Sequence, residues 1–273
     1  MQSLQSLREF RSRLYSIVET STPLVSSFLK VSNQLSTSRN PVDPSRFLSA
    51  LEQVIIKSGN STFNVFSQQD APEILVHVLA EFSSDLAFVS NLFTCEVRTS
   101  ISCDECFQES VTGEISTVLA VPLKESVQSS ISSFFLPEET NFFCLFCGEM
   151  RNGTSVNSLT RCGEYVVVQL KRFAAEGTRT LKKMNTVSSG DGKLELSVVE
   201  DAEVSGKRFF NLKAVICHHG HALKNGHYTA LVRERNTWIH CNDRAVVPAK
   251  KEALKSAVSY LYFFEASHLD LNN

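Results

Sequence analysis

The sequence contains two Cys-x-x-Cys pairs, Cys103-Asp-Glu-Cys106 and Cys144-Leu-Phe-Cys147. Two thiolate pairs at this spacing can surround one tetrahedral Zn²⁺ ion at about 2.3 Å per bond. Gly148 follows the second pair and permits the tight turn that such a loop needs. A closed four-sulfur site has no open coordination position. We therefore predict a structural zinc ion, held on two separate hairpins, and no metal catalysis.

Other interpretations of these pairs stay open. The four cysteines could be reduced, buried thiols without a metal. A redox role is disfavoured, because neither pair sits in the strand-to-helix context of thioredoxin-like motifs. A disulfide scaffold would be shorter and richer in cysteine than a chain with eight Cys in 273 residues. The cysteines thus favour an intracellular protein, in the cytoplasm, the nucleus or both.

The C-terminal third carries a second group of chemically capable residues. Gly226-His227-Tyr228 precedes, at hairpin distance, a segment that contains Asn242 and Asp243. A histidine at the start of a strand can project into a cleft, and an Asn or Asp on the next strand can fix its tautomer. A general base needs such a fixed tautomer. Cysteine proteases use this pairing, with His as the base and Asn or Asp as the orienting group.

A single histidine is more often a solvated or structurally satisfied side chain than a catalytic one. What distinguishes His227 is its context, since Gly precedes it, Tyr follows it and a Trp–Asn–Asp segment comes next. A metal site formed by His218, His219 and His221 is a further alternative, although this cluster lacks acidic partners.

The elements that position these groups differ between the two parts of the chain. Up to about residue 92 the pattern is helical, with an apolar stripe at Leu4, Leu7, Phe10, Leu14 and Ile17. We predict a short helix around Val25–Val31, a helix after Asp43-Pro44 that ends at Gly59, and a helix from Asp70 in capping-box register with Glu73.

Strand-like segments follow residue 92. They are Phe93–Ile101, Ile115–Leu123, Tyr165–Phe173, Phe209–His218, Tyr228–Arg233, Trp238–Cys241 and Val258–Phe264. The polar, Gly- and Ser-rich segment Ala174–Gly206 is predicted to be a mobile connection. Helices first and strands later indicate an α+β protein with an antiparallel sheet.

Composition narrows the class of partner. Hydrophobic residues make up 42% and charged residues 21%, which is typical of a folded globular protein. The net charge of −2 gives no field that would attract nucleic acid or membrane lipid. No apolar run approaches the ~18 residues of a membrane span. We therefore expect no nucleic-acid partner and no membrane partner.

Four motifs, in order along the chain, resemble the catalytic domain of ubiquitin-specific proteases, which are papain-like cysteine peptidases. The first is Gln68-Gln-Asp-Ala-Pro-Glu-Ile-Leu75, and the second is the two cysteine pairs. The third is Leu170-Lys-Arg-Phe173, and the fourth runs from Phe210 through Gly226-His-Tyr to Asn242-Asp243. Each motif is weak by itself, but the ordered set is specific to this family.

The resemblance implies one catalytic domain over residues 1–266 and a tail at 267–273. Its parts would be a helical thumb (1–92), zinc-bearing fingers (93–164) and an antiparallel palm (165–266). His227 would be the general base, Asn242 its orienting residue and Asp243 a supporting acid. Asp70 would receive the C-terminal tail of ubiquitin, although a helix N-cap role is compatible, and Tyr228 would line the channel for its Gly-Gly end. Ubiquitin and ubiquitinated proteins are the implied partners.

The family's nucleophile lies in an Asn-x-Cys box. The fit of Gln5, Leu7 and Phe10-Arg11 to the end of that box would place the cysteine ahead of Met1. Cys217 and Cys241 lie on strands near the predicted base, but a strand cysteine is usually a small core residue. We expect either a deubiquitinase chain begun after its Cys box or a pseudoenzyme that binds ubiquitin without hydrolysis. A peptidase for another ubiquitin-like modifier is a third interpretation.

Overall fold

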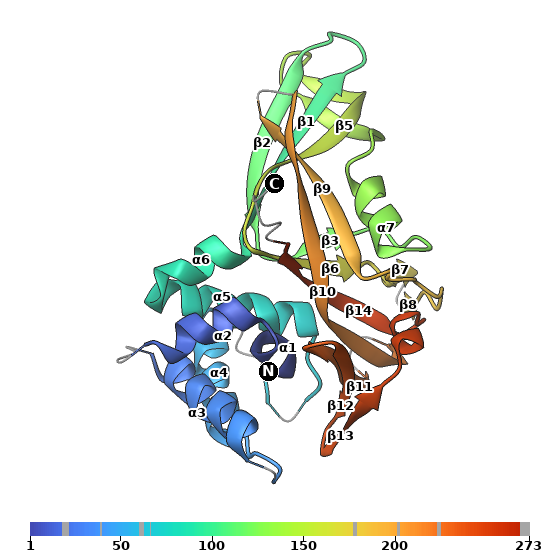
Figure 1. Cartoon of the computed structure of the whole chain (residues 1–273). Helices are drawn as coiled ribbons and strands as arrows, with labels where there is room; N and C mark the ends of the chain where they lie inside the picture. The colour runs from blue at the N-terminus through green and yellow to red at the C-terminus, as the bar shows by residue number, and fades with distance from the viewer. Residues whose placement is uncertain are drawn as a thin grey trace, which may run out of the picture.

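The computed structural model describes residues 1–17, 22–38, 40–59, 63–65, 67–176, 179–200, 203–222 and 225–267 (Figure 1). The first six helices gather at one end of the molecule, a large sheet occupies the middle and a narrow four-stranded sheet extends away from both (Figure 1). The fold is therefore a mixture of helix and sheet with the helices first in the chain, which confirms the α+β prediction. The boundaries of thumb, fingers and palm stay predictions.

The helical part is held together by aromatic packing. Phe10, Phe28 and Phe82 come from three different helices, are buried, and have ring centroids 5.1–6.4 Å apart. Such contacts stabilise a core beyond the burial of their area. The helices are α1 (Gln2–Gln5), α2 (Arg8–Tyr15), α3 (Pro23–Thr37), α4 (Ser45–Lys57), α5 (Ala71–Asp85) and α6 (Ala87–Phe93).

The helix boundaries differ in two places from those predicted. The apolar stripe at the N-terminus belongs to two helices, because Leu7 has an extended backbone (φ −78°, ψ 105°) that interrupts the helix between α1 and α2. The short helix predicted around Val25–Val31 is the middle of α3. The Thr22 side chain caps its N-terminus by accepting from the Val25 N–H, and Pro23 occupies its first position.

The central sheet has eight strands, and both of its faces are covered. The strand order is β13-β12-β11-β10-β14-β6-β3, with β9 paired to the first half of β10. Along β6, Val167 faces the helices, whereas its neighbours Val166 and Val168 face a second core on the opposite side of the sheet. The strands are β3 (Leu119–Val121), β6 (Tyr165–Leu170), β9 (Lys193–Glu200), β10 (Glu203–Ala222), β11 (Asn225–Glu234), β12 (Thr237–Asn242), β13 (Ala245–Ala249) and β14 (Ser259–Ala266).

All pairings in this sheet are antiparallel except β3 with β6. The predicted strand Phe209–His218 is the middle of the long β10. A short 3-10 helix, η1 (Lys251–Leu254), connects β13 to β14. Among the described residues, no helix combines the length and the apolar character needed to span a bilayer.

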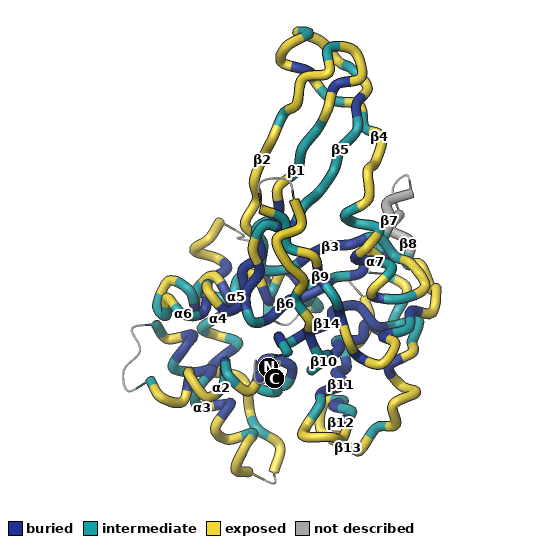
Figure 2. Tube along the Cα trace, turned by 45° about the horizontal axis from the view of Figure 1, so that its top comes forward, coloured by how far each residue is buried: buried dark blue, intermediate teal, exposed yellow. Residues whose placement is uncertain are grey.

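The narrow sheet has the order β2-β1-β5-β4. Its strands are β1 (Cys95–Cys103), β2 (Glu109–Ser116), β4 (Glu138–Cys144) and β5 (Glu149–Cys162), and α7 (Val127–Phe134) packs near its base. Val97 and Leu159 join the second core there, whereas most of the outer half is exposed (Figure 2). The outer half thus lacks an extended apolar core of its own.

The prediction of a connection over Ala174–Gly206 is wrong for most of that segment. It contains β7 (Phe173–Glu176), β8 (Arg179–Lys182) and β9, while residues 177–178 and 201–202 lie outside the described residues. Leu194 and Leu196 are buried and alternate with more exposed neighbours, which is the pattern of a strand with one covered face. The polar residues around this alternation concealed it.

Candidate active site and metal cluster

His227 and Asn242 lie on the neighbouring antiparallel strands β11 and β12. The Nε2 atom of His227 is 2.7 Å from the Oδ1 atom of Asn242. Because an amide oxygen accepts, Nε2 carries the proton and Nδ1 is left as the basic atom. The His227 side chain is 45% exposed, so this atom can reach a substrate. The sequence-based expectation that these two residues face each other is thus matched by the geometry.

Asp243 lies farther from the imidazole. Its Oδ2 atom is 3.9 Å from His227 Nε2, beyond hydrogen-bond distance, and its side chain is 79% exposed. The backbone of Asp243 adopts a left-handed conformation (φ 49°) at the turn between β12 and β13. Since solvent screens this contact, Asn242 is the principal partner of His227.

Asp70 precedes α5, but its carboxylate does not cap that helix. The capping-box interpretation is therefore wrong in its hydrogen bonding. The Tyr260 hydroxyl donates to the Asp70 carboxylate at 3.1 Å, and the Tyr228 hydroxyl lies 3.5 Å from Oδ1. Burial raises the pKa of Asp70, and the tyrosine hydrogen bonds oppose that rise. The two phenols thus connect the carboxylate at the start of α5 to strands β11 and β14.

A cavity of about 370 Å³ lies between the helical part and the sheet, and Gln69, Tyr228 and Asp243 are among its lining residues. It therefore reaches from the region of Asp70 to the His227 pair.

His218, which the sequence suggested only as a possible metal ligand, has a different place in this region. Its side chain is buried and packs against the rings of Phe173, Tyr228 and Tyr260. Burial, followed by the charge of Lys182, lowers the pKa of His218 to about 4, so the ring is neutral at physiological pH. Its Nε2 atom is 2.9 Å from the Gln68 amide nitrogen. A Gln–His contact across 150 residues leaves no local signal in the sequence.

The alternative of a metal site at His218, His219 and His221 gains no support. His219 Nε2 is 2.9 Å from the Thr229 hydroxyl, and His221 is exposed. Among the described residues, the group with suitable geometry for a metal ion consists of Cys103, Cys106, Cys144 and Cys147.

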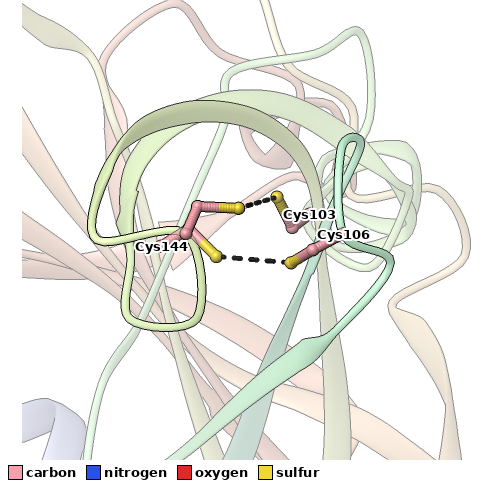
Figure 3. A group of neighbouring side chains, drawn as sticks. Cys103, Cys106 and Cys144 are labelled. Atoms are coloured by element: carbon pink, nitrogen blue, oxygen red, sulfur yellow. Dashed lines mark hydrogen bonds between the residues drawn. The ribbon is translucent and has the colours of Figure 1, made fainter.

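The four cysteine sulfurs converge on one point at the tip of the narrow sheet, as Figure 3 shows. The Cys106 and Cys144 sulfurs are 3.6 Å apart, the Cys103 and Cys147 sulfurs are 4.0 Å apart, and all four lie within 4.8 Å of one another. A tetrahedral site with bonds of about 2.3 Å requires sulfur separations of about 3.8 Å. The residues therefore fit a zinc ion, and the expected placement on two hairpins is confirmed.

Local backbone geometry shapes this cluster. Gly148 has a φ of 75°, and its N–H donates to the Cys144 carbonyl at 2.9 Å, which closes the predicted tight turn. Phe107 occupies the corresponding position after the first pair, with a φ of 58°. Backbone N–H groups of Cys147 and Phe146 lower the pKa of the Cys144 thiol to about 7, whereas the neighbouring Cys106 thiol raises the pKa of Cys147 to about 12.

The remaining four cysteines, Cys95, Cys162, Cys217 and Cys241, are buried. Burial raises the pKa of Cys95 to about 12 and that of Cys217 to about 11, and it raises those of Cys162 and Cys241 as well. A nucleophilic cysteine requires a lowered pKa. These four thiols therefore act as core residues, as predicted for Cys217 and Cys241.

The family model described as "Ubiquitin carboxyl-terminal hydrolase" matches residues 1–264. The chain belongs to the ubiquitin carboxyl-terminal hydrolase family. The family resemblance drawn from the four sequence motifs is thereby confirmed.

Individual relatives of this hydrolase-family chain are distant. It is 28% identical to probable ubiquitin carboxyl-terminal hydrolase 4 of Schizosaccharomyces pombe over 205 residues, which cover 68% of the chain and 34% of the relative. It is 26% identical to human ubiquitin carboxyl-terminal hydrolase 21 over 190 residues, covering 65% and 33%. The chain thus spans about a third of the length of these curated relatives.

A solved structure shows the same fold. The chain matches a protein in the SAGA Ubp8/Sgf11/Sus1/Sgf73 deubiquitinating module bound to ubiquitin aldehyde, with a TM-score of 0.78. The match covers 98% of this chain and 66% of the other, at 18% sequence identity. At this identity the likeness establishes the fold of the hydrolase-family chain and leaves its partners to separate evidence.

Proposed function

We propose that this chain acts in deubiquitination, as part of a thiol-dependent peptidase that hydrolyses the bond after the C-terminal Gly of ubiquitin. The observation that carries the proposal is the 2.7 Å contact between His227 and Asn242 beside a peptide-sized cavity. Membership of the hydrolase family supports the reaction class. The solved relative bound to ubiquitin aldehyde supports ubiquitin as the partner.

In this reaction His227 Nδ1 takes the proton of the nucleophilic thiol, the thiolate attacks the carbonyl carbon of the last Gly, and the imidazolium returns the proton to the leaving amine, which leaves a thioester. Water, activated by His227, then attacks the thioester, releases the ubiquitin carboxylate and regenerates the thiol. Asn242 holds the imidazole through Nε2, and Asp243 adds a negative charge 3.9 Å away. Asp70 would receive the tail of ubiquitin, since a carboxylate held by two tyrosines suits a cationic group. Tyr228 would line the channel for the Gly-Gly end.

We also propose that Cys103, Cys106, Cys144 and Cys147 hold a structural zinc ion. A four-thiolate zinc site stabilises a fold and carries out no chemistry, because it has no open position. Here it would hold together two hairpin tips that bury little apolar surface.

The eight free thiols fit a reducing compartment, so we propose an intracellular location, in the cytoplasm, the nucleus or both. Ubiquitinated proteins in that compartment would be the substrates. We expect neither nucleic acid nor a membrane to be a partner, given the near-neutral charge balance.

One observation favours a second candidate function, ubiquitin binding without hydrolysis. The eight cysteines of this sequence comprise four in the proposed metal cluster and four buried thiols. Burial raises the pKa of all four buried thiols, to about 12 for Cys95 and to about 11 for Cys217. None of these groups has the environment of a nucleophile.

Two assays on the purified chain separate these functions. Calorimetric titration with ubiquitin, and with ubiquitin that lacks its last two glycines, tests binding and its dependence on the tail. Hydrolysis of a fluorogenic C-terminal amide of ubiquitin tests turnover. Tail-dependent binding, together with turnover in a chain extended at its N-terminus by an Asn-x-Cys box, supports the peptidase. Tail-dependent binding without turnover in that extended chain supports the binding protein. Absence of binding would refute both, and preference for another ubiquitin-like modifier in the same titration would redirect the assignment.

A further inference from the structure

The ammonium group of Lys182 lies against the end of β10, although Lys182 belongs to the separate two-stranded sheet β7–β8. Its Nζ atom donates to the main-chain carbonyls of His218 and of Gly220, the latter at 3.1 Å, and is 3.3 Å from His218 Nδ1. One side chain from a neighbouring hairpin thus bonds two carbonyls, two residues apart, where β10 turns toward β11.

The same hairpin is anchored by Phe173, the first residue of β7. The Phe173 ring packs edge-on against His218 and Tyr260, with centroids 5.4 and 5.6 Å apart. The Lys182 ammonium lies 5.9 Å from the centre of the Phe173 ring, which suits a weak cation–π contact. The apolar ring and the charge therefore act on one segment of β10.

That segment packs tightly on the residues just before His227. A Cβ atom at Gly226 would lie 2.2 Å from the His219 carbonyl oxygen and 2.7 Å from His218 Nε2. A Cβ atom at Gly220, which has a φ of 132°, would lie 2.6 Å from the Asn225 carbonyl oxygen. With no room for even a methyl group, a shift of His218 or Gly220 must move Gly226 and its neighbour His227.

The tautomer of His218 follows from its neighbours. A neutral imidazole has one acceptor nitrogen, and an ammonium can only donate, so Nδ1 must accept from Lys182. Nε2 then carries the proton and requires an acceptor. The structure places the Gln68 amide nitrogen 2.9 Å from Nε2. Exchange of that nitrogen with the amide oxygen, the usual reassignment of a glutamine side chain, gives Nε2 its acceptor. Lys182 thereby also fixes the state of a ring that packs on Tyr228 at 4.8 Å.

The geometry points to Lys182 as a positioning residue, whose hydrogen bonds to the His218 and Gly220 carbonyls hold the β10–β11 connection and so the placement of His227. The inference rests on the proposed role of His227 as the base. Its readouts require no ubiquitin, so loss of this contact and failure of ubiquitin binding are distinguishable results.

The test compares Lys182→Met with Lys183→Met by NMR of the whole chain. Both variants lose one positive charge, but Lys183 is exposed and its side chain lies outside this contact. In Lys182→Met the amides of Asn225, Gly226 and His227 should exchange at least about tenfold faster than in the wild type. The His227 Hε1 resonance should shift, and the titration midpoint of His218 should rise above about 4. Lys183→Met should show none of these changes.

The groups around His218 that bear on its midpoint are Lys182, His219, Gln68, Tyr228 and Tyr260. A raised midpoint with unchanged exchange at 225–227 would reduce Lys182 to an electrostatic neighbour and overturn its positioning role. Identical His227 resonances in Lys182→Met and Lys183→Met would overturn the positioning role as well.

If Lys182→Met does not fold, the wild type still decides the matter. A hydrogen-bonded ammonium exchanges its protons slowly, so the Lys182 Nζ protons should be observable near neutral pH while those of Lys183 are not. Equal, fast exchange at both lysines would refute the contact.

Discussion

At the scale of single residues, the His227–Asn242 pair makes a prediction about tautomers. Asn242→Ala removes the acceptor at Nε2, 2.7 Å away, so the imidazole should change from one tautomer to a mixture. Long-range ¹H–¹⁵N correlation spectra report the two ring nitrogens directly. Asp243→Ala is the matched control, because its carboxylate is 3.9 Å away and 79% exposed, and the tautomer should survive this change. A single Nε2–H tautomer in both variants would show that Asn242 does not orient the ring.

Asp70 illustrates a conflict between stability and function. Burial raises its pKa above the ordinary value of 3.8, so the folded state favours the protonated form. Its contribution to stability is therefore fully present below the unfolded-state pKa and is lost as pH rises through the folded-state pKa. Asp70→Asn should raise the melting temperature at pH 7, and this gain should shrink as the pH is lowered toward 3.8.

The same substitution should weaken binding of ubiquitin at pH 7 by at least about tenfold, because a charged hydrogen-bond partner of the tail is lost. Paired thermal melts and titrations of wild type and Asp70→Asn check both effects. A variant that is less stable at pH 7, or that binds ubiquitin as well as the wild type, contradicts this role. Ubiquitin without its Gly-Gly end serves as the control ligand.

Much of the candidate site could be predicted from residue types and spacing, and the remainder has a physical explanation. His227, Asn242 and the four cysteines carry their signal in short motifs, so a hairpin or a turn suffices to bring them together. His218, Tyr260 and Lys182 meet through contacts between distant segments, and each also resembles an ordinary strand residue. Asp70 shows the opposite error, since its local sequence predicts a cap that the two tyrosines override.

At the scale of elements, apolar periodicity located the helices and strands of the core, where burial decides the side-chain pattern. It failed in much of the narrow sheet, where strands such as β2 and β4 are exposed over long stretches. It also failed in β9, whose buried face is short and lies among polar residues. In the narrow sheet, hydrogen bonds to neighbouring strands rather than a buried face define most of these elements, and β1 pairs with β5, which is far away in the sequence. A single-sequence pattern records burial and does not record such pairing.

The junction between the two sheets depends on Gly163, between β5 and β6. A Cβ atom there would lie 2.3 Å from the Leu92 carbonyl oxygen and 2.7 Å from that of Asn91, at the end of α6. All of the nearest atoms are backbone, so they cannot rotate away. Gly163→Ala should therefore destabilise the protein by about 1–3 kcal/mol, as other overpacking substitutions do.

Gly113→Ala, in the exposed strand β2, is the matched control for Gly163→Ala, because nothing lies within 4 Å of its added Cβ. Urea unfolding of the two variants measures the difference between their free energies of unfolding. A melting temperature lowered by about 2–4 °C per kcal/mol is expected for Gly163→Ala alone. Equal stability of both variants would mean that the end of α6 shifts without a free-energy penalty and that the junction is not rigid.

At the scale of the whole molecule, two cores on opposite faces of one sheet determine which parts unfold together. The first core joins the helices to β6, β10 and β14, and the second joins the same strands to the base of the narrow sheet. Shared strands couple the two cores, so they should unfold as one unit. The tip of the narrow sheet belongs to neither core, and the cysteine cluster is its main cross-connection.

Removal of zinc should consequently act at the tip alone. Elemental analysis should find one zinc per chain, and Cys103→Ser should lose it, whereas Cys95→Ala, which changes a buried thiol outside the cluster, should retain it.

In zinc-free protein, hydrogen exchange at β4 and in the Cys103–Glu109 turn should accelerate at least about 100-fold. Each factor of ten corresponds to about 1.4 kcal/mol, and structural zinc supplies several times that free energy. Protection of β6, β10 and β14 should change little, because their hydrophobic contacts do not involve the metal. Uniform loss of protection after chelation would instead make the metal part of the global folding unit, and an unchanged tip would remove zinc from this protein's architecture.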